Sequence, residues 1–419
     1  MNTLLAKLKK SKFARLISTV LFRLISCLPV KRNVILFESF SGKQYSCNPR
    51  AIYEYMRDNK YPYELIWSVN GNVASDFQKE GIPYVRRLSL TWFWIAARAG
   101  YWVTNSRMPS WVPKPKKSTY IQTWHGTPLK RLVADMEEVH MAGNTREGYI
   151  KSFHQESSHW DYLLSPNRYS TEIFKRAFNF DKTVIEEGYP RNDNLVNKND
   201  EAYIESLKVK IGLPTDKKII LYAPTWRDNE FFAEGSYKFT LKLELDKLQA
   251  QFGEDCIILL RLHYFISNAI ELTGYEHFVY DLSNYKDIND LYLVSDLLIT
   301  DYSSVFFDYA NLRRPMIFYT YDMELYKDKL RGFYFDLKQE APGPVVDTTD
   351  EVALWINKLL LNKSFNENED HNSKKVYREV GEKAEYEQKF QAFFNRFCYL
   401  DNGQVSKRVV HQLFGETKQ

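Results

Sequence analysis

The chain has 419 residues, which is longer than a single hydrophobic core usually supports. Its 44% hydrophobic and 16% aromatic content is enough to form two globular cores, so we expect two domains. The net charge of +4, from 57 basic and 53 acidic residues, is too mild to require a nucleic-acid partner, and we expect none. The cysteines lie far apart without paired spacing, which argues against a disulfide framework or a zinc site and favours a reducing cytoplasm; they are Cys27, Cys47, Cys256 and Cys398.

Residues 1–30 combine basic and apolar side chains. The basic ones are Lys7, Lys9, Lys10, Lys12, Arg15 and Arg23. The apolar ones recur every three or four positions and are Leu4, Leu5, Leu8, Leu16, Ile17, Val20, Leu21, Leu24, Ile25 and Leu28. Arg15 and Arg23 interrupt the segment before it reaches the roughly 20 apolar residues of a spanning helix, and no small-residue cleavage site of a signal peptide follows. We expect a basic amphipathic helix on the cytoplasmic face of the membrane; a helix docked on the protein core is the main alternative.

Short apolar segments then alternate with helical ones, the pattern of a parallel, doubly wound α/β sheet. In the first half, the expected strands are 33–40, 63–69, 101–106 and 119–126, with helices at 48–59 and 90–100. In the second half, they are 218–228, 256–263, 297–304 and 315–321, with a helix at 305–312, a polar loop at 362–375 and a closing helix at 385–400. The proline-, asparagine- and charge-rich stretch 186–203 predicts the boundary, so we expect domains at 31–195 and 196–419.

Open α/β sheets bind ligands at the carboxyl ends of their strands, so polar residues there are the candidates. The strongest phosphate signal is 296–315, a strand followed by a turn with Asp301, Ser303 and Ser304 and then a helix. Free amides and the dipole at the helix N-terminus, with the serine hydroxyls, would hold a phosphate or pyrophosphate. The alternative is that one serine only caps the helix.

Two further strand ends carry polar groups. Arg261 and His263 lie two residues apart in "ILLRLHY", so they share one face of their strand and suit an anionic ligand, although His263 by itself fits a structural role better. The stretch "YAPTWRDN" ends its strand with Thr225 and Arg227, which either contact a nucleotide or only form a turn.

The stretch "TWHGTPLKR" places His125 at another strand end. Gly126 removes side-chain bulk beside the imidazole, so backbone and substrate can approach closely. Pro128 suits the first turn of a helix, which predicts Lys130 and Arg131 within that turn. A histidine there can accept a hydroxyl proton near neutral pH while the cations stabilise negative charge, so we expect a catalytic base rather than a structural histidine.

Six ordered motifs carry a resemblance to a known family: "YIQTWHGTPLKRL", "WDYLLSPNRYST", "EGYPRND", "YAPTWRD", "LLRLHY" and "LITDYSSVFFDYANLRRPMIFY". Together they resemble the CDP-glycerol glycerophosphotransferase family, which builds teichoic acids and related capsules. The resemblance spans about residues 33–345, and "FESFSGKQYSCNPRAIYEYM" resembles the family's N-terminal acceptor segment, with Cys47 where an acidic residue often stands. It implies two Rossmann-like domains facing across a cleft, the glycosyltransferase-B type: an acceptor domain, then a CDP-polyol domain.

The resemblance also implies roles for single residues. His125 would be the general base, His263 would face the donor pyrophosphate, and the donor would be held by Asp301, Ser303 and Ser304 with Arg261, Thr225, Arg227 and Arg331. Gly126, Lys130, Arg131 and Glu187 would lie on the acceptor side.

The implied reaction is attack by a hydroxyl of an undecaprenyl-diphosphate-linked acceptor on the polyol-bearing phosphorus of a CDP-polyol, most simply CDP-glycerol, with CMP leaving. Positioning and charge neutralisation would supply most of the rate. We expect no tightly bound metal, and a loosely held Mg²⁺ on the donor diphosphate stays compatible with the sequence. A nucleotide-sugar glycosyltransferase of the same fold is the alternative, because fold alone does not separate the two. A non-catalytic membrane or nucleic-acid binder is the remaining class. The sequence leaves open whether the polyol is glycerol or ribitol. It also leaves open whether the protein is a primer enzyme or a polymerase.

Overall fold

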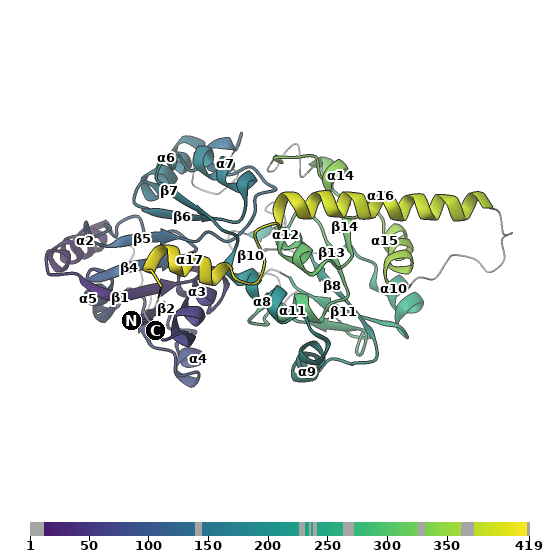
Figure 1. Ribbon diagram of the computed structural model, residues 1–419, viewed down its shortest axis with the longest axis horizontal. Helices are drawn as coiled ribbons and strands as arrows, with labels where there is room; N and C mark the ends of the chain where they lie inside the picture. Colours follow the sequence, from purple (N-terminus) through teal and green to yellow (C-terminus); the bar gives the residue numbers. More distant parts are fainter. Residues whose placement is uncertain are drawn as a thin grey trace. The chain divides into compact units, whose positions relative to one another are not determined.

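The protein is an α/β protein with two parallel sheets (Figure 1). The structure is a computed structural model, and it describes residues 12–138, 145–225, 231–233, 236–237, 241–262, 272–325, 332–361 and 373–416. The chain divides into two compact units. Unit 1 comprises residues 1–125, 147–193 and 404–419, and unit 2 comprises residues 126–146 and 194–403.

Unit 1 is built on a seven-stranded sheet of order β3-β2-β1-β4-β5-β6-β7, with every neighbouring pair parallel. Its strands are β1 (Lys31–Glu38), β2 (Glu64–Val69), β3 (Tyr84–Arg86), β4 (Ala99–Thr104), β5 (Thr119–Gln122), β6 (Tyr162–Ser165) and β7 (Thr183–Glu186). Its helices are α2 (Lys12–Ser26), α3 (Cys47–Asp58), α4 (Ala74–Lys79), α5 (Leu90–Ala96), α6 (Arg146–Ser157), α7 (Arg168–Ala177) and α17 (Val405–Phe414), with short 3₁₀ turns η1 (Phe40–Gly42) and η3 (Pro190–Asn192).

Unit 2 is built on a six-stranded parallel sheet of order β12-β11-β8-β13-β14-β15, beside a small antiparallel pair, β9 (Phe231–Ala233) and β10 (Ser236–Tyr237). The sheet strands are β8 (Lys218–Ala223), β11 (Cys256–Leu260), β12 (Val279–Asp281), β13 (Leu297–Thr300), β14 (Met316–Tyr319) and β15 (Val345–Val346). The helices are α8 (Asp193–Asn197), α9 (Glu201–Ile211), α10 (Leu245–Phe252), α11 (Ile288–Val294), α12 (Val305–Tyr309), α13 (Met323–Leu325), α14 (Leu337–Glu340), α15 (Thr349–Ile356) and α16 (Ser373–Phe397). The shorter turns are η2 (Val133–Asp135), η4 (Ala310–Leu312) and the π-helical η6 (Asn357–Leu361).

The central strands are buried along most or all of their length, as expected for parallel strands covered by helices on both faces. The apolar core of unit 1 includes Ile35, Ile52, Trp67, Val103, Ile121 and Val409. The core of unit 2 includes Ile220, Leu248, Ile258, Leu297, Ile317 and Ile356. These apolar runs made the strands recognisable in the sequence: a strand is present in each of the eight expected places, and the helices expected at 48–59, 90–100, 305–312 and 385–400 are also present.

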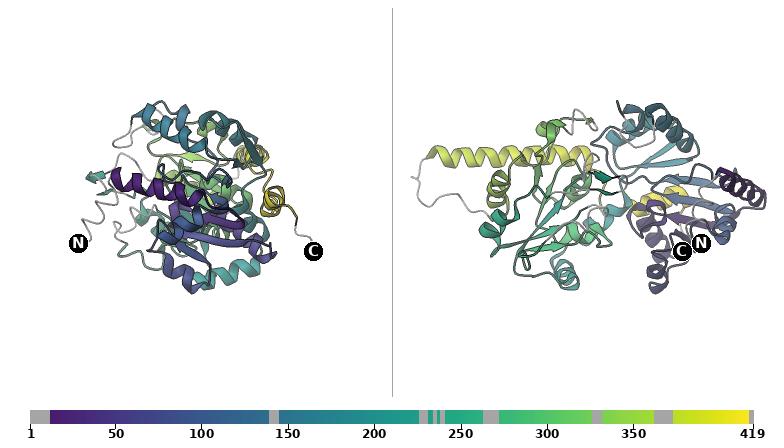
Figure 2. Two further views of the ribbon diagram at one scale, coloured as in Figure 1. Left: turned by 90° about the vertical axis from the view of Figure 1, so that its left-hand side faces the viewer. Right: turned by 180° about the vertical axis from the view of Figure 1, so that it is seen from behind.

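The C-terminal helix α17 belongs to unit 1, although the sequence placed the whole stretch 196–419 in the second domain. The Asp193 carboxylate accepts hydrogen bonds from the backbone N–H groups of Val405 (2.8 Å) and Ser406 (2.7 Å), the first two residues of the helix. Figures 1 and 2 show α17 beside α3, and Val409 is part of the unit 1 core. The apolar face of α17 is therefore buried in unit 1, a long-range pairing that local sequence does not reveal.

The helix expected from Pro128 onward is absent, and that prediction is wrong. Residues 126–132 are not helical and pair with residues 332–334 of unit 2. Arg131 N–H donates to the Gly332 carbonyl (3.1 Å), and Tyr334 N–H donates to the Leu129 carbonyl (2.9 Å). Because this strand-like pairing satisfies the backbone groups, the segment does not need a helix to do so. The cleft between the two domains stays a prediction.

Each sheet reverses its strand order at one point, which we call its switch point. In unit 1 the chain passes from β1 to β2 and β3, then returns to β4 on the other side of β1. In unit 2 it passes from β8 to β11 and β12, then returns to β13 on the other side of β8. The carboxyl ends of β1 and β4, and of β8 and β13, are therefore the expected ligand sites of this architecture.

Candidate active site

His125 lies just beyond the carboxyl end of β5, next to the switch point of unit 1. Its Nδ1 atom is 2.7 Å from the backbone carbonyl oxygen of Asn105, the residue that follows β4. A carbonyl oxygen can only accept, so Nδ1 carries the proton and Nε2 of the neutral ring keeps its lone pair. The imidazole is thereby held in the tautomer that can accept a proton.

Aromatic neighbours fix the plane of this ring. The Trp124 ring stacks on it at a centroid distance of 4.7 Å and an interplanar angle of 29°. The Phe40 ring meets it edge-on at 5.5 Å and 63°. Trp124 itself packs against Phe153, Phe174 and Phe178 of unit 1, so the stack rests on an aromatic cluster.

The surroundings lower the pKa of His125 from 6.5 to about 4. Burial is the largest cause, the hydrogen bond to Asn105 opposes it, and the nearby charge of Arg191 adds to the lowering. The residue nevertheless keeps an exposed surface, so solvent moderates the effect of burial. The direction of the shift is what matters: the imidazole is neutral, and so a competent base, at pH 7.

The backbone before His125 is held in an unusual conformation. Trp124 has φ 51°, a left-handed conformation that costs on the order of 1–3 kcal/mol in a residue with a side chain. Two side chains hold it there. Gln122 Oε1 accepts from the Trp124 N–H (3.0 Å), and the buried Asn48 Nδ2 donates to the carbonyls of Thr123 (3.2 Å) and Trp124 (3.3 Å).

A cation also lies in this site. Arg191 N–H donates to Asn48 Oδ1 (3.2 Å), and its guanidinium Nη1 lies 3.2 Å from Cys47 Sγ and over the ring of Tyr189. Asn48, Asn105 and Arg191 were all missed as site residues. The available signals were the polar residues after β4 in "VTNSR" and the arginine within "YPRND".

At the switch point of unit 2, a buried carboxylate organises two loops. Asp301 follows β13, is 1% exposed, and accepts backbone N–H groups of Thr225 (2.8 Å) and Tyr302 (2.5 Å) on Oδ1. Thr225 follows β8, so this carboxylate joins the ends of the two strands between which the order reverses. The sequence predicted both residues as donor-binding, and the structure brings them together.

The two serines follow this carboxylate and are partly exposed. Ser304 occupies the N-cap position of α12, but its side chain makes no capping hydrogen bond. A Cβ atom added to Gly126 would lie 3.1 Å from Ser304 Oγ, so the glycine packs its backbone directly against that serine. Gly126 and Ser304 both belong to unit 2, so this contact lies within that unit.

Other predicted site residues have structural partners. Arg261 Nη1 donates to the carbonyls of Leu282 (2.9 Å), Ser283 (2.6 Å) and Tyr285 (2.7 Å), so it holds the loop after β12. Glu187 accepts a hydrogen bond from Arg408 of α17 (2.7 Å).

The remaining predicted residues divide into two groups. The side chain of Arg131 forms an ion pair with Glu137, and the backbone of Lys130 forms an isolated antiparallel β-bridge with Phe333. His263, Arg227 and Arg331 lie outside the described residues.

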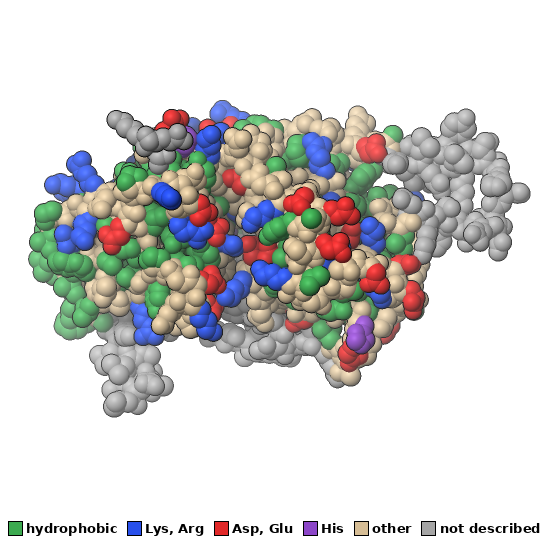
Figure 3. Space-filling view, turned by 60° about the horizontal axis from the view of Figure 1, so that its bottom comes forward, with side chains coloured by type: hydrophobic (Ala, Val, Ile, Leu, Met, Phe, Trp, Pro, Cys, Tyr) green, Lys and Arg blue, Asp and Glu red, His purple; other side chains and the backbone are tan. Residues whose placement is uncertain are grey.

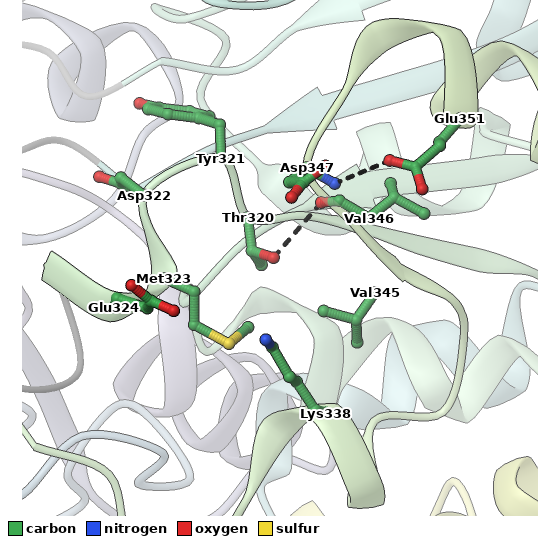
Figure 4. A pocket seen from close by; sticks show the side chains of 10 residues that line it. All are labelled: Thr320, Tyr321, Asp322, Met323, Glu324, Lys338, Val345, Val346, Asp347 and Glu351. Carbon is green, nitrogen blue, oxygen red and sulfur yellow. Dashed lines mark hydrogen bonds between the residues drawn. The ribbon is translucent and has the colours of Figure 1, made fainter.

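Unit 2 also contains an open cavity of about 630 Å³ beyond the carboxyl ends of β14 and β15 (Figure 4). Its lining includes the carboxylates Asp322, Glu324, Asp347 and Glu351 and one cation, Lys338, whose side chain points into the cavity in Figure 4. This excess of negative charge repels a diphosphate, so the serine loop is the better anion site. Tyr302 O–H donates to Asp322 (3.0 Å) and thereby links cavity and loop.

The described residues contain neither a cluster of metal ligands nor a membrane-spanning helix. No group of three or more His, Cys, Asp or Glu side chains there could hold a metal ion. Among the same residues, no helix is both long and apolar enough to cross a membrane.

Two parallel sheets, each with a polar site at its switch point, define a two-unit α/β protein of the kind that binds nucleotides. More particularly, the chain belongs to the family described as CDP-Glycerol:Poly(glycerophosphate) glycerophosphotransferase, which matches residues 20–415. The family resemblance read from the motifs is therefore confirmed.

Relatives of known function are similar over most of this chain. It is 54% identical over 394 residues to the teichoic acid poly(glycerol phosphate) polymerase of Bacillus subtilis (strain 168), covering 94% of this chain but only 50% of that protein. It is 51% identical over 401 residues to the protein of the same name from Bacillus spizizenii (strain ATCC 23059 / NRRL B-14472 / W23), covering 95% and 96%. Among solved structures, the wall teichoic acid polymerase TagF, in a variant combined with CDPG, matches with a TM-score of 0.81 and 43% identity, over 94% of this chain and 91% of that one.

Proposed function

We propose that this protein transfers glycerol phosphate from CDP-glycerol to a hydroxyl of a lipid-linked teichoic acid acceptor and releases CMP. The observation that carries the proposal is the neutral imidazole of His125, whose Nδ1–H is bound to Asn105 and whose Nε2 is left as the base. The similarity to poly(glycerol phosphate) polymerases supports glycerol over ribitol.

The chemistry assigns His125 one step. The acceptor hydroxyl oxygen forms a bond to the phosphorus that carries glycerol, and the bond from that phosphorus to the bridging oxygen breaks. CMP leaves with the bonding electrons, while Nε2 of His125 takes the hydroxyl proton. Holding the two reactants in line accounts for much of the rate, because it converts a bimolecular encounter into a unimolecular step.

The donor is assigned to unit 2. Asp301 fixes two backbone segments, which leaves the Ser303 and Ser304 hydroxyls to donate to the diphosphate. Arg261 supports this site through the loop after β12. His263, Arg227 and Arg331 stay predicted donor-binding residues.

The acceptor is assigned to unit 1 and the segment that leaves it. Arg191 beside His125 supplies a positive charge for an anionic acceptor. Lys130, Arg131 and Glu187 stay predicted acceptor-side residues. Their contacts with Phe333, Glu137 and Arg408 help to position the loops that carry them.

The helix α2 supports binding to a membrane surface. Its Phe22 is fully buried against Trp92, Phe93 and Trp102, so the helix is docked on unit 1. Most of its other large apolar side chains are exposed: Phe13, Leu16, Ile17, Val20, Leu21 and Leu24. Figure 3 shows hydrophobic surface with Lys and Arg beside it on unit 1. An apolar helix face flanked by cations suits an anionic lipid surface.

The activity is tested by incubating the protein with CDP-glycerol, CDP-ribitol and a panel of UDP-sugars, each with a lipid-linked acceptor, and measuring the released nucleotide. CMP released from CDP-glycerol alone supports the proposal. Release of UDP from a UDP-sugar, without CMP, would instead identify a glycosyltransferase.

Membrane binding is tested without disturbing the docked face of α2. Replacing Leu16, Val20 and Leu24 by serine should abolish sedimentation with anionic vesicles, and high salt should weaken binding of the unaltered protein. Val209→Ser, at a 67% exposed valine of unit 2, is the matched control. Unchanged sedimentation of the triple variant would refute the surface role of α2.

A further inference from the structure

Asn105 connects the imidazole of His125 to a strained turn. It follows β4 directly and is fully buried. Its Oδ1 accepts the backbone N–H of Phe40 (2.8 Å), and its Nδ2 donates to Ser39 Oγ (3.1 Å). Because a backbone N–H can only donate, the orientation of this amide is fixed. The carbonyl of the same residue accepts the Nδ1–H of His125 (2.7 Å).

The turn that Asn105 holds is unfavourable by itself. Phe40 and Ser41 have φ 45° and 58°, a left-handed conformation that residues with a Cβ atom seldom adopt. Hydrogen bonds from neighbouring side chains hold it. Besides the bond that the Phe40 N–H donates to Asn105 Oδ1, the Ser41 N–H donates to Ser106 Oγ (2.8 Å). Without the Asn105 side chain, the backbone at Phe40 loses the partner that fixes its direction.

This turn places the Phe40 ring against the imidazole, edge-on at 5.5 Å. The ring of His125 is thus fixed by the Trp124 stack, the Phe40 edge and the Nδ1 hydrogen bond. Two of these three contacts pass through Asn105, one through its side chain and one through its carbonyl.

We propose that Asn105 is a positioning residue of the transfer reaction: it holds the Phe40 turn and the imidazole together, so that Nε2 of His125 faces the acceptor hydroxyl. This inference rests on the proposed role of His125 as the base. Asn105 itself does not touch the reacting atoms in this account; it acts through His125.

The first test is Asn105→Ala, which removes both side-chain hydrogen bonds and keeps the carbonyl. The kcat with CDP-glycerol should fall roughly 10–100-fold while the KM for CDP-glycerol changes less than about twofold, because the donor is assigned to unit 2. The acid limb of kcat/KM against pH should also move upward. Burial is the main cause that lowers the pKa of His125 to about 4, so a loosened turn that admits water returns the pKa toward 6.5, while Arg191 still opposes protonation.

A second variant keeps the test valid if Asn105→Ala does not fold. Phe40→Leu retains an apolar side chain and removes the ring edge beside His125. It should move the acid limb in the same direction, with a smaller loss of kcat. In the double variant the two losses should not add, because both changes act through one turn.

Asn167→Ala is the matched control. Asn167 is also fully buried in unit 1 after a strand, and its Oδ1 accepts the Ser170 N–H (2.9 Å) as the cap of α7. It should lower stability and leave the pH profile unchanged. The inference is overturned if folded Asn105→Ala keeps its kcat within twofold and its acid limb in place, or if Asn167→Ala gives the same shift. If His125→Ala itself retains activity, the proposed base is wrong instead, which separates the two failures.

Discussion

The two switch points of this protein are built by opposite means. In unit 1, the side chains of Asn48 in α3 and Gln122 in β5 bind the backbone of Trp124, and the backbone carbonyl of Asn105 binds the imidazole of His125; together they hold one ring in place. In unit 2, a single buried carboxylate, Asp301, binds two backbone N–H groups and leaves the adjacent serine hydroxyls partly exposed. The first arrangement fixes the direction of a proton acceptor, and the second offers donors to an anion.

This difference indicates how proton transfer and donor binding are divided between the two sites in the proposed reaction. Proton transfer requires a group held at a defined angle, which three converging contacts provide. Diphosphate binding requires several hydrogen-bond donors. Their angles are less restricted, because the phosphate oxygens accept from many directions. Variants of the first site should therefore lower turnover, and variants of the second should lower donor affinity.

The largest effect is expected for His125→Ala. Turnover should fall on the order of 10²–10⁴-fold, the usual range for loss of a general base, with the KM for CDP-glycerol nearly unchanged. The rate of CMP release under saturating donor measures this. His154→Ala is the control, since His154 also bonds a carbonyl, that of Ala177 (3.2 Å), but lies on α6. Loss of donor affinity instead of turnover would move His125 to the donor side of the comparison.

Asp301→Ala should come next and should act on affinity. Two backbone N–H groups lose their acceptor, so the loop that carries the serines loosens, and CDP-glycerol should bind roughly 10–100-fold more weakly by calorimetry. Asp296→Ala is the matched control. Asp296 binds the Ile219 N–H (2.8 Å) at the opposite end of β13, so its loss should reduce stability alone. Equal donor affinity in both variants would contradict the donor assignment.

A smaller effect is expected for Gly126→Ala. The added methyl group would lie 3.1 Å from Ser304 Oγ, and displacing that serine should weaken donor binding by about 1 kcal/mol, roughly fivefold. Gly71→Ala, whose new Cβ would meet nothing closer than 3.8 Å, is the control and should be neutral. If Gly126→Ala lowers turnover alone, the glycine serves the base rather than the serine loop.

The smallest effect is expected for Ser304→Ala. The hydroxyl makes no cap, so its removal should leave the melting temperature nearly unchanged and cost up to about 1 kcal/mol of donor affinity. Thermal unfolding and calorimetry with CDP-glycerol measure the two quantities. A lower melting temperature with full donor affinity would support the capping role that the sequence left open.

The predictable and unpredictable parts of this fold differ in sequence distance. The strands, and the place of Asp301, Ser303 and Ser304 at a strand end, could be predicted from neighbouring residues alone. An apolar run followed by polar residues marks the carboxyl end of a strand. Asn48 could not be assigned, because the carbonyl of Trp124 that it binds is 76 residues away. The segment after Pro128 was predicted as helix for the same reason: its partners, residues 332–334, are about two hundred residues further on.

The central claim is that His125 is neutral, with its proton on Nδ1 and its lone pair on Nε2. Nitrogen NMR of the protein with labelled histidine, titrated from pH 4 to 8 and assigned with the spectrum of His125→Ala, tests this directly. We expect the Nδ1–H tautomer at pH 7 and a pKa below 6.5, since burial disfavours the charged ring. An Nε2–H tautomer at pH 7, or a pKa above 6.5, would contradict the account.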